Sequence, residues 1–513
     1  MTHDAALLAA DAKARDDALD VTRSFIVQAP AGSGKTELLI QRYLRLLATV
    51  DSPEEVIAIT FTRKAAAEMQ HRVLQALLRA QRGEVPEAPH ERITAEAAAT
   101  VLERDGLHNW RLVANPRRMR IQTLDSLNAS IARMQPLTGA AASGNTVGNE
   151  AEVKALYRAA AAATLDWLAE AGDLRDAVHE ILFHVDNNTS LYVSYLSRML
   201  ETRDQWLPFV GSGQMENPSA LRGTLEANLC KVVDAHLSQL RDLFPRELLP
   251  ELLPLADYAA GNLVAAGKSG HPVATLHELS ALPEASADAL DAWRGVAALL
   301  LTAAGGWRKR VNVNDGFPPG DDGQKDALYD LIEAASQTPG LPGLLHGIRA
   351  LPPASYPDEQ WSVLLALFRL LPMAVAELQQ LFSSNRLTDF IEIALAADEA
   401  LGSAGSPGDV ALLLDYQVRH LLVDEMQDTS RAQYRMLEAL TGGWEPGDGR
   451  TLFCVGDPMQ SIDRFRNAEV AQFLLAQRKG IGGLVLERLL LRRNFRSGEF
   501  LVHWFNTVFP QVL

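Results

Sequence analysis

The chain of 513 residues has little cysteine and few aromatic side chains. Its two cysteines, Cys230 and Cys454, stand in unrelated surroundings, which excludes a disulfide framework and a cysteine-rich metal cluster. No uninterrupted apolar run reaches the length of a membrane span, and the first residues lack the basic start and apolar core of a secretion signal. We therefore expect a cytoplasmic protein without a membrane partner.

An excess of positive charge is also missing. The 48 basic and 64 acidic residues leave a formal net charge of −16. Proteins that coat nucleic acid by bulk charge are usually basic, so any contact with nucleic acid must come from a local basic surface. The apolar share of 47% and the charged share of 22% are typical of soluble globular proteins, and the length predicts several domains.

The hydrophobic pattern alternates between strands and helices at both ends of the chain. Residues 24–28 and 56–60 are short apolar runs rich in β-branched residues, and each precedes a stretch of helical spacing. Strand-like runs return at 419–424 and 451–457, whereas alanine and leucine at helical spacing dominate from about 150 to 385. The pattern predicts an α/β fold with a parallel sheet and a large inserted helical domain.

A glycine-rich turn between the first strand and the next helix matches the phosphate-binding loop pattern. The turn consists of Ala29, Pro30, Ala31, Gly32, Ser33, Gly34, Lys35 and Thr36, with Ala29 where the pattern usually has glycine. Such a turn at a helix N-terminus points backbone N–H groups at phosphate oxygens. Lys35 would contact the β- and γ-phosphates of ATP, and the Thr36 hydroxyl would bind Mg²⁺. The fold is therefore predicted to be of the P-loop NTPase class.

Two carboxylates follow the apolar strand at 421–423. Because adjacent side chains at the end of a strand point to opposite sides, Asp424 can hold the metal ion while Glu425 reaches a position suited to orienting the attacking water. A solvated loop end is the alternative for such a pair. The phosphate-binding loop earlier in the chain favours the catalytic interpretation.

Six segments, in the same order, resemble the motifs of superfamily 1 DNA helicases of the UvrD/Rep type. They are residues 29–36, 60–69, 121–127, 424–430, 455–462 and 494–497. The string TFTRKAAAEM at 60–69 is the most specific of them. The size of the insert, and Asp389-Phe390 before the acidic pair, resemble the RecB/AddA branch of this family.

The resemblance implies an ATP-dependent DNA helicase that moves 3′ to 5′ and acts in DNA repair or recombination. Its partners would be single-stranded DNA and junctions of single- and double-stranded DNA, and a partner subunit of a helicase–nuclease complex is a candidate. It implies that Gln460 senses the γ-phosphate, that Arg496 contacts it and that the Phe495 ring stacks on adenine.

The resemblance also implies a set of DNA contacts. Phe61 and Phe465 would stack on bases, with ordinary core packing as the alternative for each ring. The residues implied along the DNA backbone are Thr62, Arg63, Thr123 and Arg466. Three basic clusters, at 117–120, at 488–496 and at 307–310, are further candidates for backbone contact, with solvated loops as the alternative.

The domain limits that follow from the resemblance divide the chain into four segments. Residues 1–149 and 386–483 would form a first RecA-like ATPase domain, 150–385 the inserted helical domain, and 484–513 the start of a second motor domain. The last two motifs of the family are absent. We therefore expect that residues 1–513 do not unwind DNA by themselves.

Two further departures leave alternatives open. Asp463 stands where the family usually has an aromatic residue, and the glutamine that reads adenine has no clear counterpart, so adenine selectivity is undecided. An ATP- and single-stranded-DNA-binding subunit without motor activity is the alternative function. A small-molecule kinase on a P-loop fold is disfavoured by the string at 60–69.

Overall fold

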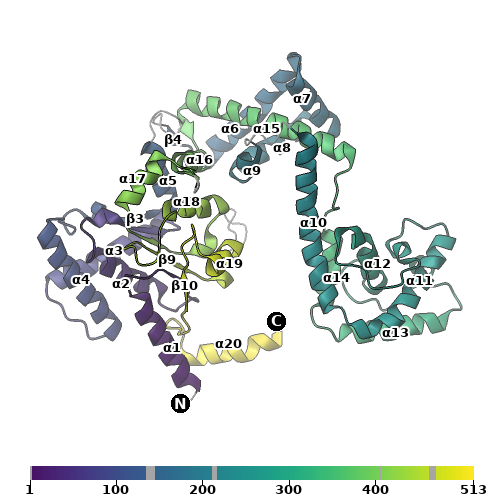
Figure 1. Cartoon of the computed structure of the whole chain (residues 1–513), viewed down its shortest axis with the longest axis horizontal. Helices are drawn as coiled ribbons and strands as arrows, with labels where there is room; N and C mark the ends of the chain where they lie inside the picture. Colours follow the sequence, from purple (N-terminus) through teal and green to yellow (C-terminus); the bar gives the residue numbers. More distant parts are fainter. Residues whose placement is uncertain (1–2, 135–144, 211–216, 404–405, 462–469, 513) are drawn as a thin grey trace. The chain divides into compact units, whose positions relative to one another are not determined.

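A computed structural model describes residues 3–134, 145–210, 217–403, 406–461 and 470–512. The chain divides into two compact units. Unit 1 comprises residues 1–164, 193–208 and 373–513, and unit 2 comprises residues 165–192 and 209–372. Figure 1 shows the elements of both units.

Unit 1 is built around a six-stranded sheet in which every pair of neighbouring strands is parallel. The strands, in the order in which they lie, are β10 (Glu487–Leu490), β1 (Phe25–Gln28), β9 (Thr451–Gly456), β8 (His420–Val423), β2 (Val56–Thr60) and β3 (Arg120–Thr123). The residues of β2, β8 and β9 are buried throughout, as expected for a parallel sheet covered on both faces. The predicted α/β fold class is confirmed.

Alternation along the strands divides the core of unit 1 into two layers. Phe25 and Val27 belong to one layer and Ile26 to the other, because successive side chains of a strand point to opposite faces. The first layer packs on α1 (His3–Ala18), α2 (Lys35–Leu47), α3 (Arg63–Gln81) and α4 (Pro89–His108). The second packs on α5 (Leu124–Met134), α16 (Phe390–Leu401), α17 (Asp409–Gln417), α18 (Arg431–Thr441) and α19 (Val470–Lys479) (Figure 1).

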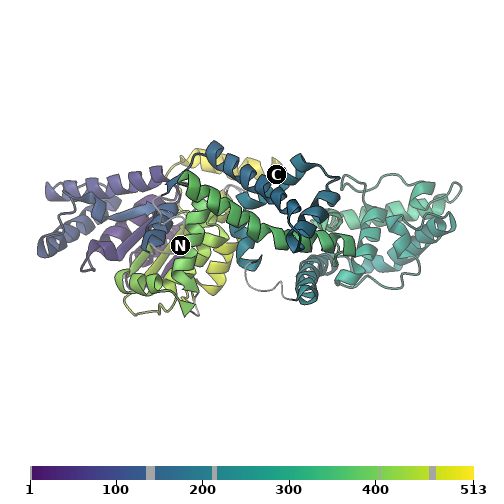
Figure 2. The same ribbon diagram turned by 90° about the horizontal axis from the view of Figure 1, so that it is seen from above.

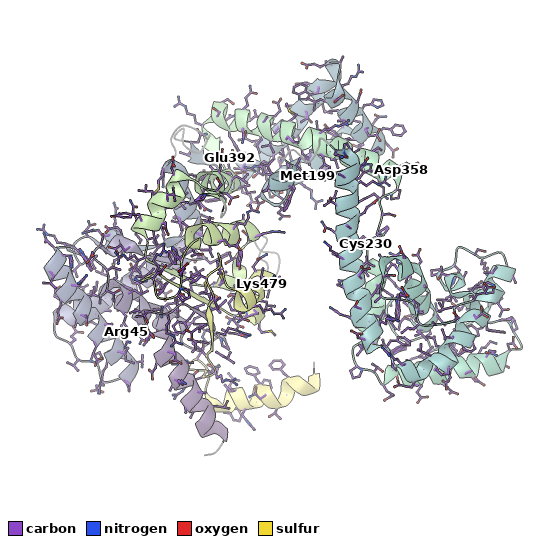
Figure 3. All side chains as sticks on the ribbon, in the orientation of Figure 1. Arg45, Met199, Cys230, Asp358, Glu392 and Lys479 are labelled. Atoms are coloured by element: carbon purple, nitrogen blue, oxygen red, sulfur yellow. The ribbon has the colours of Figure 1, made fainter. Side chains whose placement is uncertain are left out.

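A smaller helical core in unit 1 is fixed by a buried ion pair. The core is formed by α6 (Glu150–Ala163), α9 (Arg203–Val210) and the ends of α8 (Thr189–Glu201) and α15 (Asp358–Asn385). The fully buried Arg203 donates two hydrogen bonds to Asp389, at 2.8 and 2.6 Å, and one to Glu392 on α16 at 3.1 Å. Glu392 is labelled in Figure 3. Asp389 also caps α16 by accepting the N–H of Glu392, so it joins Arg203 to the start of that helix.

The remaining elements of unit 1 are short or terminal. They are β4 (Thr146–Val147), which pairs with β5 (Leu387–Thr388), the pair β6 (Gly402–Ser403) and β7 (Ser406–Pro407), and the helix α20 (Glu499–Val512). Among the described residues, every strand belongs to unit 1.

Unit 2 is built of helices (Figure 2). Its complete helices are α7 (Asp173–His184), α10 (Pro218–Leu243), α11 (Leu249–Ala265), α12 (Leu290–Leu300), α13 (Asp322–Ser336) and α14 (Leu341–Gly347). Trp293 of α12 is fully buried in the core that α10 to α14 share, and its indole N–H donates to the carbonyl of Glu284. Cys230 lies on α10 (Figure 3) and Cys454 on β9 of unit 1, and both are free thiols.

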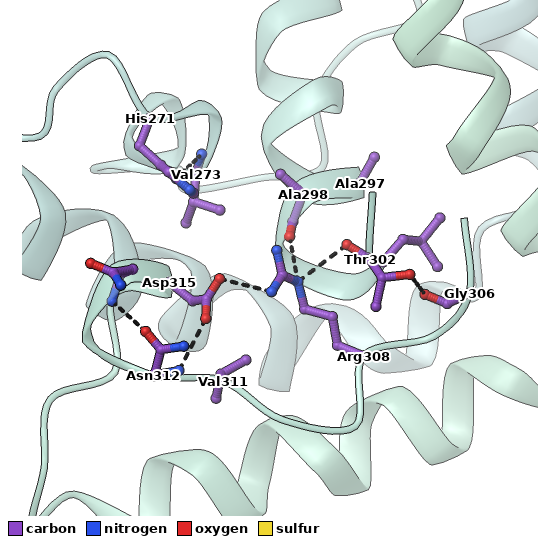
Figure 4. A network of polar contacts seen from close by, with 12 residues as sticks. His271, Val273, Ala297, Ala298, Thr302, Gly306, Arg308, Val311, Asn312 and Asp315 are labelled. Atoms are coloured by element: carbon purple, nitrogen blue, oxygen red, sulfur yellow. Dashed lines mark hydrogen bonds and ion pairs between the residues drawn. The ribbon is translucent and has the colours of Figure 1, made fainter. Parts of the chain in front are cut away.

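The basic cluster at 307–310 lies in unit 2, and its first arginine has a structural role. Arg308 donates to the carbonyls of Ala298 and Leu301, at 2.9 and 3.1 Å, and forms an ion pair with Asp315 at 2.7 Å (Figure 4). These bonds hold the loop to the end of α12, and DNA contact by the cluster stays a prediction. Lys309 and Arg310 are exposed.

The helix α15 passes a test for membrane spans by length and composition alone. It is the one described helix that does, and 39% of its most apolar window is buried inside the structure. Core helices of soluble proteins pass the same test, so this is weak evidence.

One predicted domain limit is corrected by the sheet. Residues 484–513 were expected to begin a second motor domain, but β10 pairs with β1 along its whole length, from Phe25 opposite Glu487 to Gln28 opposite Leu490. The first sheet therefore extends to Leu490. Its edge strand is largely exposed and partly charged, which is why the sequence pattern did not reveal it. The limits at 149 and 385 stay predictions.

Candidate nucleotide-binding site

The predicted site residues gather at one edge of the sheet because all six strands are parallel. The carboxyl ends of parallel strands meet at the same edge, where open α/β sheets bind ligands. The phosphate-binding loop follows β1, Asp424 follows β8, Asp457 follows β9, and residues 491–497 follow β10. The ends of β2 and β3, which carry the predicted DNA residues, lie farther along the same edge.

The phosphate-binding loop has the backbone that its sequence predicts. Gly32 and Gly34 have φ of 79° and 77°, which a residue with a Cβ adopts only under strain. Gly34 caps α2, so the unpaired N–H groups of the first helical turn lie beside the loop. Ala29 is fully buried and its N–H donates to the carbonyl of Gly456 at 2.9 Å, whereas Pro30 and Ala31 are exposed. The Ser33 hydroxyl is buried without a partner among the described residues.

Lys35 forms an ion pair with Glu425. The distance from its Nζ to Oε1 is 2.5 Å, and both side chains are partly exposed. Glu425 has φ of 51° and ψ of 43°, a left-handed conformation that costs a non-glycine residue about 1 kcal/mol. The strand ends at Val423, and Glu425 follows Asp424 in this left-handed turn.

Hydrogen bonds continue from this ion pair to Gln460. Gln427 donates from Nε2 to Glu425 Oε2 at 2.8 Å, and its Oε1 accepts the N–H of Asp457 at 2.9 Å. Asp457 in turn accepts from Nε2 of Gln460 at 2.6 Å. Gln427 and Asp457 are buried, so the bond between them is shielded from water. Sequence reasoning assigned neither residue a role, although both lie within the matched motifs.

Asp424 is suited to a cation. Burial and, after it, the neighbouring charge of Glu425 raise the pKa of Asp424 to about 6. Its Oδ1 accepts the N–H of Glu425 at 3.0 Å, and a bound cation would offset the cost of burying the charged form. Mg²⁺ prefers oxygen ligands and usually combines one or two protein groups with phosphates and waters. Asp424 and the hydroxyl of Thr36 fit that donor set, although no cluster of three or more ligating side chains exists among the described residues.

The segment 492–496 is bound to the phosphate-binding loop. The N–H of Phe495 donates to the carbonyl of Gly32 at 2.7 Å, and a Cβ at Gly32 would lie 2.5 Å from Oδ1 of Asn494. The Phe495 ring is 56% exposed and has the guanidinium groups of Arg15 and Arg493 at 5.0 and 4.9 Å from its centroid. Arg496 is exposed beside it. These contacts bring the predicted base-stacking ring to the phosphate-binding loop.

The helix α1 supplies two residues that sequence reasoning missed. Asp11, which is 3% exposed, accepts the N–H groups of Arg492 and Arg493 at 2.7 and 3.1 Å. Its other oxygen accepts from Arg15 Nε at 2.8 Å, and Arg15 also donates to the carbonyl of Ser33 at 2.8 Å. Burial alone would raise the pKa of Asp11, but these hydrogen bonds outweigh it and lower the pKa. No local pattern marks the pair, because its partners lie in distant segments.

The predicted DNA residues are only partly available. Phe61 is half-buried, Arg63 is exposed, and the Thr62 hydroxyl caps α3 by accepting the N–H of Ala65 at 3.0 Å. Thr123 is buried, and its hydroxyl bonds with Ser126 at the start of α5. Phe465, Arg466 and Asp463 lie outside the described residues.

The basic cluster at 117–120 lies away from this edge. Arg118 forms two hydrogen bonds with Glu54, at 2.7 and 2.9 Å, and Met119 is buried. Arg120 begins β3 and lies opposite Ile57, at the amino end of the strands. Arg118 and Arg120 therefore lie at the opposite edge of the sheet from the phosphate-binding loop, and DNA contact at this cluster stays a prediction.

Comparisons with known proteins agree with the motifs. A family model described as the UvrD/REP helicase N-terminal domain matches residues 11–205 and 369–480, which together make more than half of the chain. An ATP-dependent helicase/nuclease subunit from Lysinibacillus sphaericus is 26% identical over 529 residues, covering 95% of this chain and 38% of that protein. Its namesake from Moorella thermoacetica is 28% identical over 520 residues, covering 95% of this chain and 34% of that protein. This chain spans little more than a third of the length of these relatives.

Proposed function

The chain belongs to the UvrD/Rep helicase family, and on that premise we propose that it is the ATP-binding part of a DNA helicase. The enzyme would hydrolyse ATP to move 3′ to 5′ along single-stranded DNA in repair or recombination. The likeness to subunits of ATP-dependent helicase/nucleases supports a cytoplasmic enzyme that works with a partner subunit. Its substrates would include junctions of single- and double-stranded DNA.

One observation carries the proposal. The ion pair of Lys35 and Glu425 joins the phosphate-binding loop to the acidic pair, and hydrogen bonds continue from it through Gln427 and Asp457 to Gln460. A phosphate group entering the loop would compete with Glu425 for Lys35, since both are anions. Release of Glu425 would then free its carboxylate and alter the bonds that lead to Gln460.

The residues of the site take the following roles in this proposal. The loop N–H groups and Lys35 bind the phosphates, and Phe495 stacks on the base. Thr36 and Asp424 hold Mg²⁺, which neutralises phosphate charge when bound. Glu425, once released, orients the attacking water, while Gln460 and Arg496 contact the γ-phosphate and stabilise its developing charge.

The DNA-binding role rests on the carboxyl ends of β2 and β3. Phe61 and Arg63 follow β2, and both have exposed surface on the same sheet edge as the phosphate-binding loop. We propose that Phe61 and Phe465 stack on bases. Thr62, Arg63 and Arg466 would contact the DNA backbone. Thr123 would act through its backbone, because its hydroxyl is buried.

The test is ATP hydrolysis by the protein with and without single-stranded DNA. We expect DNA to stimulate hydrolysis and Glu425→Gln to abolish the stimulated rate, while Glu103→Gln, a matched variant at an exposed position of α4 outside the motifs, retains it. A stimulated rate that survives Glu425→Gln would contradict the proposed role. ATP and DNA binding without any stimulation would favour the alternative, a binding subunit without motor activity.

A second experiment concerns unwinding by residues 1–513. We propose that this segment binds nucleotide but does not unwind a 3′-tailed duplex, because a translocating helicase needs two motor domains that close on ATP. Unwinding by this segment that is lost in Lys35→Ala would contradict that proposal.

A further inference from the structure

The helix α1 lies beside two parts of the nucleotide-binding site that are far apart in the sequence. Its Ala14 and Ala18 are buried in the core layer that also contains α2, the helix that follows the phosphate-binding loop. The same helix contacts β10, the strand that leads to residues 492–496. A side chain on α1 can therefore reach both the loop and the segment 492–496.

Asp11 is the side chain of α1 that connects the two. Its Oδ1 accepts the N–H groups of Arg492 and Arg493, at 2.7 and 3.1 Å, just after β10 ends. Its Oδ2 accepts from Nε of Arg15, whose Nη2 donates to the carbonyl of Ser33 in the loop. Asp11 is buried, so water competes little for these bonds. One carboxylate therefore links the phosphate-binding loop to the segment that follows β10.

These bonds determine where the residues after 493 lie on the loop. The N–H of Phe495 donates to the carbonyl of Gly32 at 2.7 Å. The Cβ of Arg496 lies 2.8 Å from the position that a Cβ on Gly32 would occupy. The start of the Arg496 side chain is therefore next to the loop, and the residue is exposed. Where its guanidinium group can reach depends on how the chain is held at 492 and 493.

A purely structural role is the alternative for Asp11. A buried carboxylate that accepts three hydrogen bonds contributes to the stability of the fold whether or not a nucleotide binds. The two roles differ in the folded protein. A structural role changes the melting temperature and leaves nucleotide affinities as they are. A positioning role changes these affinities, above all the affinity for a nucleotide that carries a γ-phosphate.

We propose that Asp11 is a positioning residue for ATP, which holds residues 492–496 against the phosphate-binding loop so that Arg496 reaches the γ-phosphate. The proposal rests on the function proposed above, in which Arg496 contacts that phosphate. It goes beyond that function because it assigns a role to a residue outside the motifs, which acts through the segment 492–496 and not through the nucleotide itself.

The experiment is competition binding to residues 1–513 in the presence of Mg²⁺. An ATP analogue that cannot be hydrolysed, and ADP, each displace a fluorescent ADP. The ratio of their two affinities measures the contribution of the γ-phosphate. We expect Arg496→Ala to lower this ratio about tenfold, because it loses a charged contact. Asp11→Ala should lower the ratio by a similar factor, because it removes both links of Asp11.

Asp11→Asn tests the same role with a side chain of the same size, and it decides the question if Asp11→Ala does not fold. Its amide oxygen can accept the N–H groups of Arg492 and Arg493, but its NH₂ group cannot accept from Arg15. We expect the ratio to fall about threefold, since one of the two links is lost. The exposed change Asp16→Asn on the same helix is the matched control and should keep the wild-type ratio. A wild-type ratio in Asp11→Asn, with folding checked by its melting temperature, would overturn the proposal.

A double variant tests whether Asp11 acts through Arg496. When Arg496→Ala is already present, Asp11→Asn should lower the ratio no further, because the group that it positions is gone. A further threefold fall in the double variant would mean that Asp11 acts independently of Arg496, and the proposal would be wrong.

Arg496→Ala also separates this inference from the function on which it rests. If Arg496→Ala keeps the wild-type ratio, the proposed contact with the γ-phosphate is wrong and the inference fails with it. If Arg496→Ala lowers the ratio and Asp11→Asn does not, the contact stands and only the positioning role of Asp11 fails.

Discussion

Replacing Asp389 by asparagine should destabilise unit 1 strongly. Asp389 is 5% exposed and receives two hydrogen bonds from Arg203, which is fully buried. Asparagine can still cap α16, so the variant removes the charge and leaves the cap in place. Arg203 then keeps Glu392 as its remaining carboxylate partner, at 3.1 Å. The variant therefore removes the charge of the ion pair together with the bonds that Oδ2 accepts from Tyr157 and Arg203.

The magnitude follows from the cost of leaving a buried charge uncompensated. Breaking a buried pair by neutralising one partner costs about 3–5 kcal/mol. At about 2 °C for each kcal/mol in a large unit, the melting temperature should fall by about 6–10 °C. Burial by itself raises the pKa of Asp389, but the hydrogen bonds and charge of Arg203 outweigh it and lower the pKa, so the carboxylate is charged at neutral pH.

The assay is urea unfolding followed by circular dichroism at pH 7. Asp16→Asn, an exposed change on α1, is the matched control and should alter the free energy of unfolding by about 0.5 kcal/mol or less. A loss below about 1 kcal/mol in Asp389→Asn would refute the reasoning, because it would mean that the buried Arg203 does not need this charge.

Three further predictions concern stability and the loop. Arg42 is fully buried and donates to three backbone carbonyls, so Arg42→Met should cost about 3 kcal/mol or more in urea unfolding, and a cost near zero would contradict that role. Burial lowers the pKa of His420 from 6.5 to about 4, so its neutral form stabilises the fold above pH 6.5 and that stability is lost as the pH falls toward 4. His420→Gln should remove about 3 kcal/mol of the pH dependence between pH 7 and 4, and an identical profile would refute the assignment. Gly32→Ala should weaken nucleotide binding and stability through its positive φ and the contact with Asn494, whereas Gly106→Ala, in an open helical position, should stabilise by about 0.5–1 kcal/mol; equal effects of the two would contradict the strained turn.

Local patterns in the sequence predicted the sheet well where the strands are buried. The strand predicted at 56–60 has those bounds, because a run of buried β-branched residues is a strong signal for a parallel strand. The edge strand β10 gave no such signal, since its side chains include charged residues and lie at an exposed edge. Its place depends on pairing with β1, which lies more than 400 residues earlier in the chain.

The same contrast separates the predicted site residues from those that were missed. Lys35, Asp424 and Glu425 were predicted because short motifs follow directly after strands. Asp11 and Arg15 were missed because their partners are backbone groups of segments that only the fold brings together. The basic clusters at 117–120 and at 307–310 show a further limit of sequence reasoning. A sequence shows charge, but it does not show that Glu54 and Asp315 pair with that charge.

The most direct test of the account is nucleotide binding by residues 1–513 in Mg²⁺, compared among the wild type, Lys35→Ala and Glu425→Gln. Lys35→Ala should bind nucleotide at least about tenfold more weakly than the wild type, because it loses the charged contact with the phosphates. Glu425→Gln should bind nucleotide at least as tightly as the wild type, because it removes the anion that pairs with Lys35 at 2.5 Å. If Lys35→Ala binds as tightly as the wild type, or if Glu425→Gln binds more weakly than it, the site at this edge of the sheet does not work as described.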